Sequence, residues 1–264
     1  MELCVREADF IQEEKKMFDF ATLWKNVSKN VTFVLEFLAI IVALFVIAVI
    51  IEKIQQKKSG KSGAFFTAHK MAVIGILSAM SSVLMLFEIP LFFAPSFYKL
   101  DFSEIPILLG SFAFGPAAGV VMEFIKILLK LVMKGTSTAF VGELANFAVG
   151  CSFIIPASTI YLFKKTKKTA ILSCVIGTVI LTVFGTMFNA VYLLPAFSKL
   201  FHMPMESILE MGSKVNPLMT EGSITSFVIV CVAPLNLLKG TLVSAVTIFI
   251  YKPLSRFLKG NGNK

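Results

Sequence analysis

Four sets of polar side chains interrupt long apolar runs, and their types suit either ligand binding or contacts between helices. Acids and lysines supply charge, and asparagines supply both hydrogen-bond donors and acceptors. Inside a lipid bilayer an ionisable side chain costs about 2.5–3.5 kcal/mol to insert, so it usually faces a partner or a cavity. In chain order the sets are Glu123 with Lys126 and Lys130, Glu143 with Asn146, Asn189, and Asn236 with Lys239.

The first set lies on one helix face, because its members are three and four residues apart. Glu123 and Lys126 can neutralise each other there, so helix packing and a functional role both stay open for this pair. Lys130 is expected to extend its ammonium group to the outer membrane surface.

Asn189, Asn236 and Lys239 are harder to explain by packing alone. They offer two amide groups and one cation, and the apolar runs that contain them hold no acid to pair with the lysine. An unpaired lysine in a bundle interior predicts a polar ligand, or a distant carboxylate such as Glu143.

Motifs of catalysis and metal binding are missing from the sequence. It has no HExxH or GxSxG motif, and no paired aspartates within an apolar run. Its two histidines, His69 and His202, lie in a linker and a loop, and its four cysteines lack metal-type spacing. We therefore expect no enzymatic activity, no metal and no cofactor.

The composition is that of an all-α integral membrane protein. Of 264 residues, 56% are hydrophobic and 16% are charged, and the mean hydropathy is +0.84. A soluble domain has about 25% charged residues, and one compact domain could not bury this much apolar surface. This excludes a soluble enzyme and a nucleic-acid-binding domain, and makes the lipid bilayer the first expected partner.

The apolar runs also divide the chain into segments. The run 31–51 has Glu36 as its single charged residue and no cleavage site after it, so it predicts a retained anchor helix. The expected segments are a polar segment at 1–30, the anchor helix at 31–52, a basic linker at 53–67, a membrane domain at 68–258 and a tail at 259–264. The membrane domain is expected to hold six helices, at roughly 70–87, 103–114, 117–133, 140–163, 170–197 and 224–251.

Charges in the loops predict the orientation. Thirteen cations and no acid occur in three places, 53–70, 164–168 and the region from 252 to the end. The other connections together hold four cations and five acids. By the positive-inside rule the basic places lie in the cytoplasm, which requires six core spans and a cytoplasmic C-terminus. Nucleic acid is not needed to explain a net charge of +9.

The first core helix carries two pairs of small residues four apart, Gly75 with Ala79 and Ser78 with Ser82. Such ridges let another helix approach closely. Packing inside the bundle and a contact with a partner protein are both open on spacing alone.

Residues 68–258 resemble the RibU family, the riboflavin-binding S components of energy-coupling factor (ECF) vitamin transporters. The resemblance depends on motifs that occur in a fixed order, of which the first and the fifth are the most specific. They are KLDFSEIP at 99–106, FGP at 114–116, EFIK at 123–126, KGT at 134–136, GELANF at 142–147, FN at 188–189, LP at 194–195 and NLLK at 236–239.

This resemblance implies a six-helix membrane subunit that binds a vitamin near the outer face of the bacterial cytoplasmic membrane and hydrolyses nothing. Its expected partners are riboflavin, a transmembrane coupling subunit and two ATPases. The small residues of the first helix would contact the coupling subunit. The residues expected at the substrate by motif match are Asn189, Asn236 and Lys239, the loop residues Phe97, Leu100 and Asp101, and, in ordering the outer part of the site, Glu143 and Asn146.

Other interpretations stay open. The substrate could be a flavin analogue or another vitamin. A membrane enzyme or a structural subunit using the Glu123/Lys126 face is a second class, although that face lacks a nucleophile or a metal set. The anchor helix lies outside the resemblance, and a tether for residues 1–30 is a third interpretation.

Overall fold

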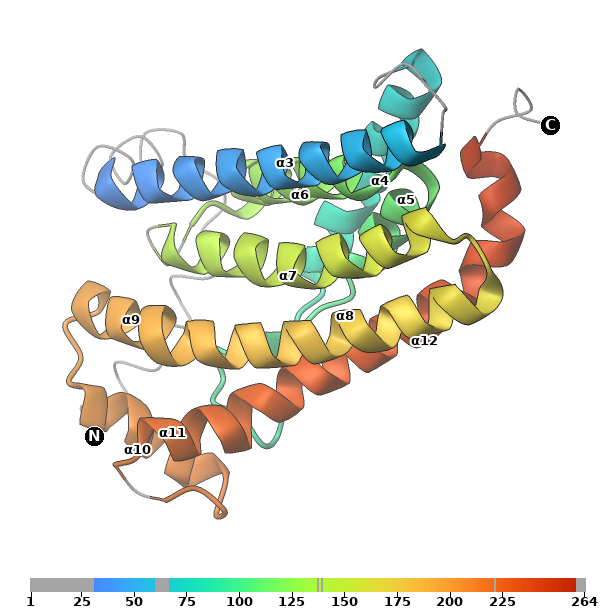
Figure 1. Cartoon of the computed structure of the whole chain (residues 1–264). Coiled ribbons are helices and arrows are strands. Elements are labelled where there is room, and N and C mark those ends of the chain that lie inside the picture. The colour runs from blue at the N-terminus through green and yellow to red at the C-terminus, as the bar shows by residue number, and fades with distance from the viewer. Residues whose placement is uncertain (1–30, 60–66, 137, 139, 221, 260–264) are drawn as a thin grey trace.

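The computed structural model describes residues 31–259 except 60–66, 137, 139 and 221. The predicted polar segment 1–30 therefore lies outside the described residues. Long helices run side by side through the molecule, and a short two-stranded ribbon joins two of them (Figure 1). The first half consists of α3 (Val31–Ser59), α4 (Ala68–Leu86), β1 (Ile89–Pro90), β2 (Lys99–Leu100), α5 (Glu104–Phe114), α6 (Pro116–Lys134) and α7 (Val141–Phe163).

The second half contains two long helices, each interrupted by one π-helical turn. The first is built from α8 (Lys167–Phe188), η1 (Asn189–Leu193) and α9 (Leu194–Leu200). The second is built from α11 (Ile224–Phe227), η2 (Val228–Val232) and α12 (Ala233–Lys259), and the short α10 (Met205–Val215) lies between the two. Such turns are frequent at functional sites, and η1 begins at Asn189, one of the residues expected at the substrate.

The predicted all-α membrane fold is confirmed, and within the described residues it comprises six core helices preceded by α3. Among the described residues, five helices are long and apolar enough to cross a membrane. The other two core helices fall short for clear reasons: α5 has 11 residues, and α6 carries four charged side chains. The five spans are Val34–Lys58, Ala68–Leu86, Val141–Phe163, Lys167–Leu200 and Ile224–Tyr251.

The break between α5 and α6 follows from Gly115 and Pro116. Gly115 has φ of +101°, which favours glycine, and Pro116 begins α6 at a position where its missing N–H is tolerated. The break places α5 and α6 side by side, and both pack on α4 and α7. The short α5 and the charged α6 thus lie inside the bundle, where α4 and α7 cover them.

Three apolar clusters hold the bundle together. One joins α4, α5, α7, α8 and α12, one joins α9, α10 and η2 to the loop before α5, and one joins α3 to α6 and α7. Large apolar side chains remain exposed along α3, α4 and α8, as expected for helices that face lipid.

The N-terminal helix is longer than predicted. It continues from Val31 to Ser59, so residues 53–59 of the predicted basic linker are helical. A run of apolar residues marks the part of a helix that lies in lipid, whereas lysines are good helix formers and continue the same helix into water. Residues 60–66 of the predicted linker lie outside the described part of the chain.

Candidate substrate-binding site

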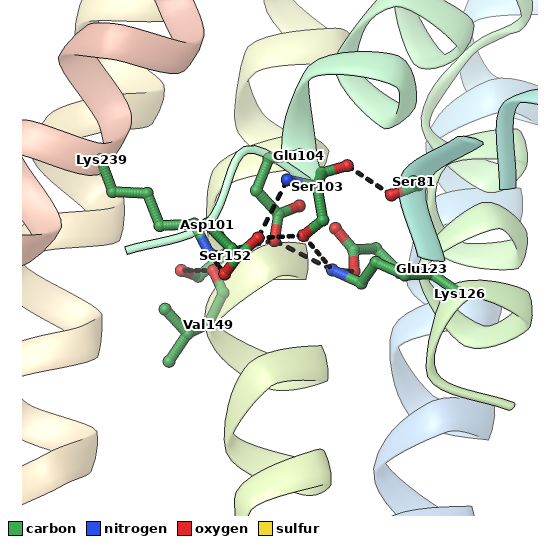
Figure 2. A network of polar contacts seen from close by, with 9 residues as sticks. All are labelled: Ser81, Asp101, Ser103, Glu104, Glu123, Lys126, Val149, Ser152 and Lys239. Carbon is green, nitrogen blue, oxygen red and sulfur yellow. Dashed lines mark hydrogen bonds and ion pairs between the residues drawn. The ribbon is translucent and has the colours of Figure 1, made fainter. Parts of the chain in front are cut away.

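Five charged side chains from four parts of the chain meet in the bundle interior (Figure 2). The Lys239 ammonium lies 3.0 Å from Asp101 Oδ2 and 3.4 Å from Glu104 Oε1. The Lys126 ammonium lies 3.0 Å from Glu104 Oε1 and 2.6 Å from Glu123 Oε2. Glu104 therefore connects the two lysines, and the network joins α6 to α12 through the start of α5.

Asp101 is fixed at the loop before α5 by local hydrogen bonds. Its Oδ1 accepts hydrogen bonds from the backbone N–H of Ser103, at 2.9 Å, and from the Ser103 hydroxyl. The Ser103 carbonyl in turn accepts from the Ser81 hydroxyl of α4. Burial alone would raise the pKa of Asp101, but the ammonium groups of Lys239 and Lys126 outweigh burial and hold that pKa below its ordinary value. Asp101 is thus a fixed anion facing Lys239.

These contacts change two predictions and confirm one. A polar ligand or a distant carboxylate such as Glu143 was expected beside Lys239, and the structure places two distant carboxylates there, which are Asp101 and Glu104 and not Glu143. Lys130 does not extend to the outer surface: its side chain is 13% exposed and its ammonium lies 2.6 Å from Glu143 Oε1. The pairing of Glu123 with Lys126 is confirmed.

Glu143 instead organises the connection between α6 and α7. Its Oε2 accepts hydrogen bonds from the hydroxyls of Thr136 and Thr138, each at 3.0 Å, and Lys130 binds its other oxygen. The carboxylate lies in the first turn of α7, where the helix dipole favours negative charge. Glu143 therefore ties this loop to two helices.

Tyr98, which sequence reasoning did not select, positions Asn189. Its hydroxyl donates a hydrogen bond of 2.6 Å to Asn189 Oδ1, and Asn189 Nδ2 donates one of 2.7 Å to the Gly185 carbonyl. Both side chains are buried, and burial raises the pKa of Tyr98 above its ordinary value, so its hydroxyl keeps the proton that it donates. Tyr98 directly follows Phe97, which was selected from the sequence, and it directly precedes the KLDFSEIP motif, so its position was the available signal.

Asn236 lies beside Gly185 and has a free donor. The side chain is buried, and its Nδ2 has no hydrogen-bond partner. A Cβ atom at position 185 would lie 2.6 Å from that nitrogen, so glycine allows the close contact between α8 and α12. Buried amide groups are almost always hydrogen-bonded in native proteins, so this donor is available to a ligand.

Together these residues form one polar arrangement around the loop before α5. Tyr98 bonds Asn189, Asp101 bonds Lys239, and Gly185 adjoins both Asn189 and Asn236. Asp101 is three residues from Tyr98 in the same loop. The loop is thus attached at two places. Tyr98 joins it to Asn189 at the junction of α8 and η1, and Asp101 joins it to Lys239 of α12. All five polar residues are buried, at most 8% exposed.

Apolar groups from the same loop lie beside this arrangement. The Phe97 ring lies 4.7 Å from the Tyr98 ring and 6.3 Å from that of Phe197, and Tyr98 lies 6.1 Å from Phe227. Leu100 is buried. In Asn146, on α7, the buried Oδ1 also lacks a hydrogen-bond partner. The loop thus supplies aromatic rings, and α7 and α12 supply unpaired polar atoms, which are the two kinds of group that a site for a flat polar molecule requires.

The predicted partner-contact residues divide into two pairs. Gly75 and Ala79 are exposed on α4, and a Cβ atom at Gly75 would meet nothing within 4 Å. Ser78 and Ser82 are buried, and their hydroxyls donate to the carbonyls of Ile74 and Ala79. The exposed small residues of this helix are therefore Gly75 and Ala79.

Comparison with known proteins identifies the family. Residues 69–251 match the family model described as "ECF transporter, substrate-specific component". The chain is 32% identical to the riboflavin transporter RibU of Staphylococcus aureus and 30% identical to the riboflavin transporter FmnP of Bacillus subtilis. Each alignment covers 72% of this chain. It also covers 92% of the Staphylococcus aureus protein and 94% of the Bacillus subtilis protein.

A solved structure agrees with these matches. It is described as "Structure and mechanism of the S component of a bacterial ECF transporter" and shares 30% sequence identity with this chain. The two superpose with a TM-score of 0.55 over 72% of this chain and 98% of that one. The family match begins at residue 69, after α3. This chain belongs to the family of substrate-specific components, or S components, of ECF transporters.

Proposed function

We propose that this chain is the riboflavin-binding subunit of an ECF transporter. The observation that carries the proposal is the unpartnered Nδ2 of Asn236, buried beside Asn189 and Lys239 at the attachment points of an aromatic loop. The relatives named riboflavin transporters support this choice of substrate.

The chemistry of the site suits riboflavin. The vitamin has a flat ring with a polar edge, and a chain of hydroxyl groups. The amides of Asn189 and Asn236 and the ammonium of Lys239 would bind the polar edge or the hydroxyl chain, while Phe97 and Leu100 cover the ring. Capture at about nanomolar concentration needs roughly 12 kcal/mol of binding free energy, so most of the ligand must be enclosed.

Asp101, Glu143 and Asn146 have supporting roles in this proposal. Asp101 holds Lys239 in place and partly neutralises it, and an ammonium hydrogen that is not bonded to Asp101 would donate to the ligand. Glu143 fixes the α6–α7 connection. The free Oδ1 of Asn146 offers an acceptor on the neighbouring helix.

Delivery into the cell would require partner subunits. The chain would bind the vitamin at the outer face of the bacterial cytoplasmic membrane, with its C-terminus in the cytoplasm. A transmembrane coupling subunit would contact Gly75 and Ala79, and two ATPases would hydrolyse ATP. The relatives named as transporters support the part of the proposal in which the chain itself catalyses no reaction.

Absorption and fluorescence test the substrate. The purified protein should absorb between 350 and 500 nm through a copurified ligand that is released on denaturation and identified as riboflavin. The apoprotein should quench the fluorescence of added riboflavin. If no flavin copurifies and added riboflavin is not quenched, the substrate is not a flavin. The search would then turn to other vitamins.

Two variants test the site. Asn236→Ala and Lys239→Ala should each weaken riboflavin binding tenfold or more, because each removes a polar group from the ligand's surroundings. Thr241→Ala is the matched control on α12, because the Thr241 hydroxyl is exposed and bonds the carbonyl of Leu237 in its own helix. Unchanged affinity in both test variants would remove these residues from the site.

A further inference from the structure

The N-terminal helix α3 lies against α6 and α7 along the bundle (Figure 1). One side of it is buried: Ala48 is 0% exposed and Phe37 is 5% exposed. The Phe37 ring meets the Phe147 ring of α7 edge-on, with centroids 5.6 Å apart. The other side, with Val42 and Ile47, is about half exposed. This is the pattern of a packed membrane helix with one face toward lipid.

Near its C-terminal end, α3 completes the start of α6. Glu52 is 5% exposed, and its Oε1 accepts a hydrogen bond of 2.9 Å from the backbone N–H of Ala117. The first N–H groups of a helix have no partner within it, and negative charge is favourable there. Gly115, just before α6, lets the Glu52 carboxylate approach the backbone closely.

Near its N-terminal end, α3 contacts the π-helical turn. Glu36 Oε2 accepts a hydrogen bond of 2.8 Å from the Tyr192 hydroxyl. Tyr192 lies in η1, three residues after Asn189. Glu36 and Glu52 are sixteen positions apart, roughly 24 Å along a helix, so polar contacts attach α3 at both ends of the bundle.

We propose that α3 is a seventh helix of the substrate-binding unit, packed on α6 and α7, which stabilises the start of α6 and restrains η1. The helix is not a loose membrane anchor. It occupies the α6/α7 face of the bundle, which is therefore closed to other proteins. The part of the proposal that concerns η1 depends on the proposed riboflavin site, whereas the packing of α3 does not.

The packing is tested by cutting the chain after α3. A protease recognition site is placed within residues 60–66 of the full-length protein, which is purified in mild detergent and cleaved. The N-terminal fragment should remain with residues 67–264 on size-exclusion chromatography. Separation of the fragment from the core would overturn the proposal, whatever the substrate is.

A matched pair of substitutions makes this test specific. Ala48→Phe places a large ring where α3 meets α6 and α7, and should release the cleaved fragment. Ile47→Phe, on the exposed side of the same helix, adds a ring of the same type toward lipid and should leave the fragment bound. If both variants release the fragment, or both retain it, the claim that the Ala48 side of α3 packs on α6 and α7 is contradicted.

The contact with η1 is tested by a double-mutant cycle on riboflavin affinity. Glu36→Leu, which leaves no acceptor for the Tyr192 hydroxyl, and Tyr192→Phe should each weaken binding about threefold, and the double variant should lose no more than either single one. Additive effects, or no effect, would refute the coupling of α3 to the site. If the protein binds no riboflavin at all, the proposed function fails, and the cleavage test still decides the packing of α3.

Discussion

The hydroxyl of Tyr98 donates a 2.6 Å hydrogen bond to Asn189 Oδ1, and this bond orients the Asn189 amide. With Nδ2 donating to the Gly185 carbonyl, one amide hydrogen and one oxygen lone pair remain free. The two residues are 91 positions apart in the sequence. The loop before α5 therefore decides which atoms of Asn189 a ligand can reach.

Removing this hydroxyl should loosen the amide and weaken binding. Tyr98→Phe is expected to raise the Kd for riboflavin about fivefold, which corresponds to about 1 kcal/mol for one lost hydrogen bond. Fluorescence quenching measures the effect. Tyr251→Phe is the control, since it removes a hydrogen bond to the carbonyl of Phe112 in another part of the bundle. An equal loss of affinity in both variants would point to general destabilisation instead.

The Asp101–Lys239 ion pair should contribute to stability as well as to binding. Asp101→Asn leaves Lys239 with Glu104 as its remaining partner, at 3.4 Å. Breaking a buried ion pair costs about 3–5 kcal/mol, so the Tm in detergent should fall by several degrees. Glu210→Gln breaks an exposed pair with Lys214 and should change the Tm little.

A second substitution tests whether the loss of stability comes from leaving the Lys239 charge without Asp101. The double variant Asp101→Asn with Lys239→Met removes both charges, and its Tm should recover part of the loss. A double variant less stable than Asp101→Asn would show that Lys239 still stabilises the fold through Glu104 when residue 101 is neutral.

Low pH should abolish the contribution of Asp101. Its pKa in the folded protein lies below the ordinary value of about 3.9. A carboxyl group with a lowered pKa stabilises the fold above its unfolded pKa, and this contribution is lost as pH falls through the folded pKa. The Tm difference between the native protein and Asp101→Asn should thus be constant from about pH 5 to pH 7 and shrink below about pH 4. A difference that shrinks between pH 7 and pH 5 would contradict the lowered pKa.

Local patterns explain which features could be predicted. The six core helices follow from apolar runs, and the break at Gly115-Pro116 follows from two residues with strong backbone preferences. Glu123 and Lys126 are three apart on one helix, so their ion pair was visible as spacing. In each case the sequence neighbours are also spatial neighbours.

Contacts between distant segments could not be predicted in this way. Asp101 and Lys239 are separated by 138 positions, and helix periodicity does not show which loop lies over which helix. Glu143 was an equally reasonable partner for Lys239 until the fold placed it beside Lys130. The role of Glu52 was hidden for the same reason, since its hydrogen-bond partner is the backbone of Ala117, 65 positions away.

The exposed small residues of α4 predict a contact with the coupling subunit. Since α3 covers the face of α6 and α7, Gly75 and Ala79 offer the close approach that helices in membranes need. Gly75→Leu should prevent copurification with the coupling subunit and reduce uptake at least tenfold, because the side chain keeps the helices apart. Riboflavin affinity of the isolated protein should not change, since Gly75 is exposed and a Cβ atom there would meet nothing within 4 Å.

The effect of a larger side chain on any exposed helix must be distinguished from its effect at the proposed contact on α4. Ala39→Leu is the matched control, because Ala39 is also exposed but lies on α3. It should leave complex formation and uptake intact. If Ala39→Leu blocks assembly while Gly75→Leu does not, the coupling subunit docks on α3 and not on α4. Loss of uptake in Gly75→Leu with an intact complex would place the role of this glycine in the movement that follows docking.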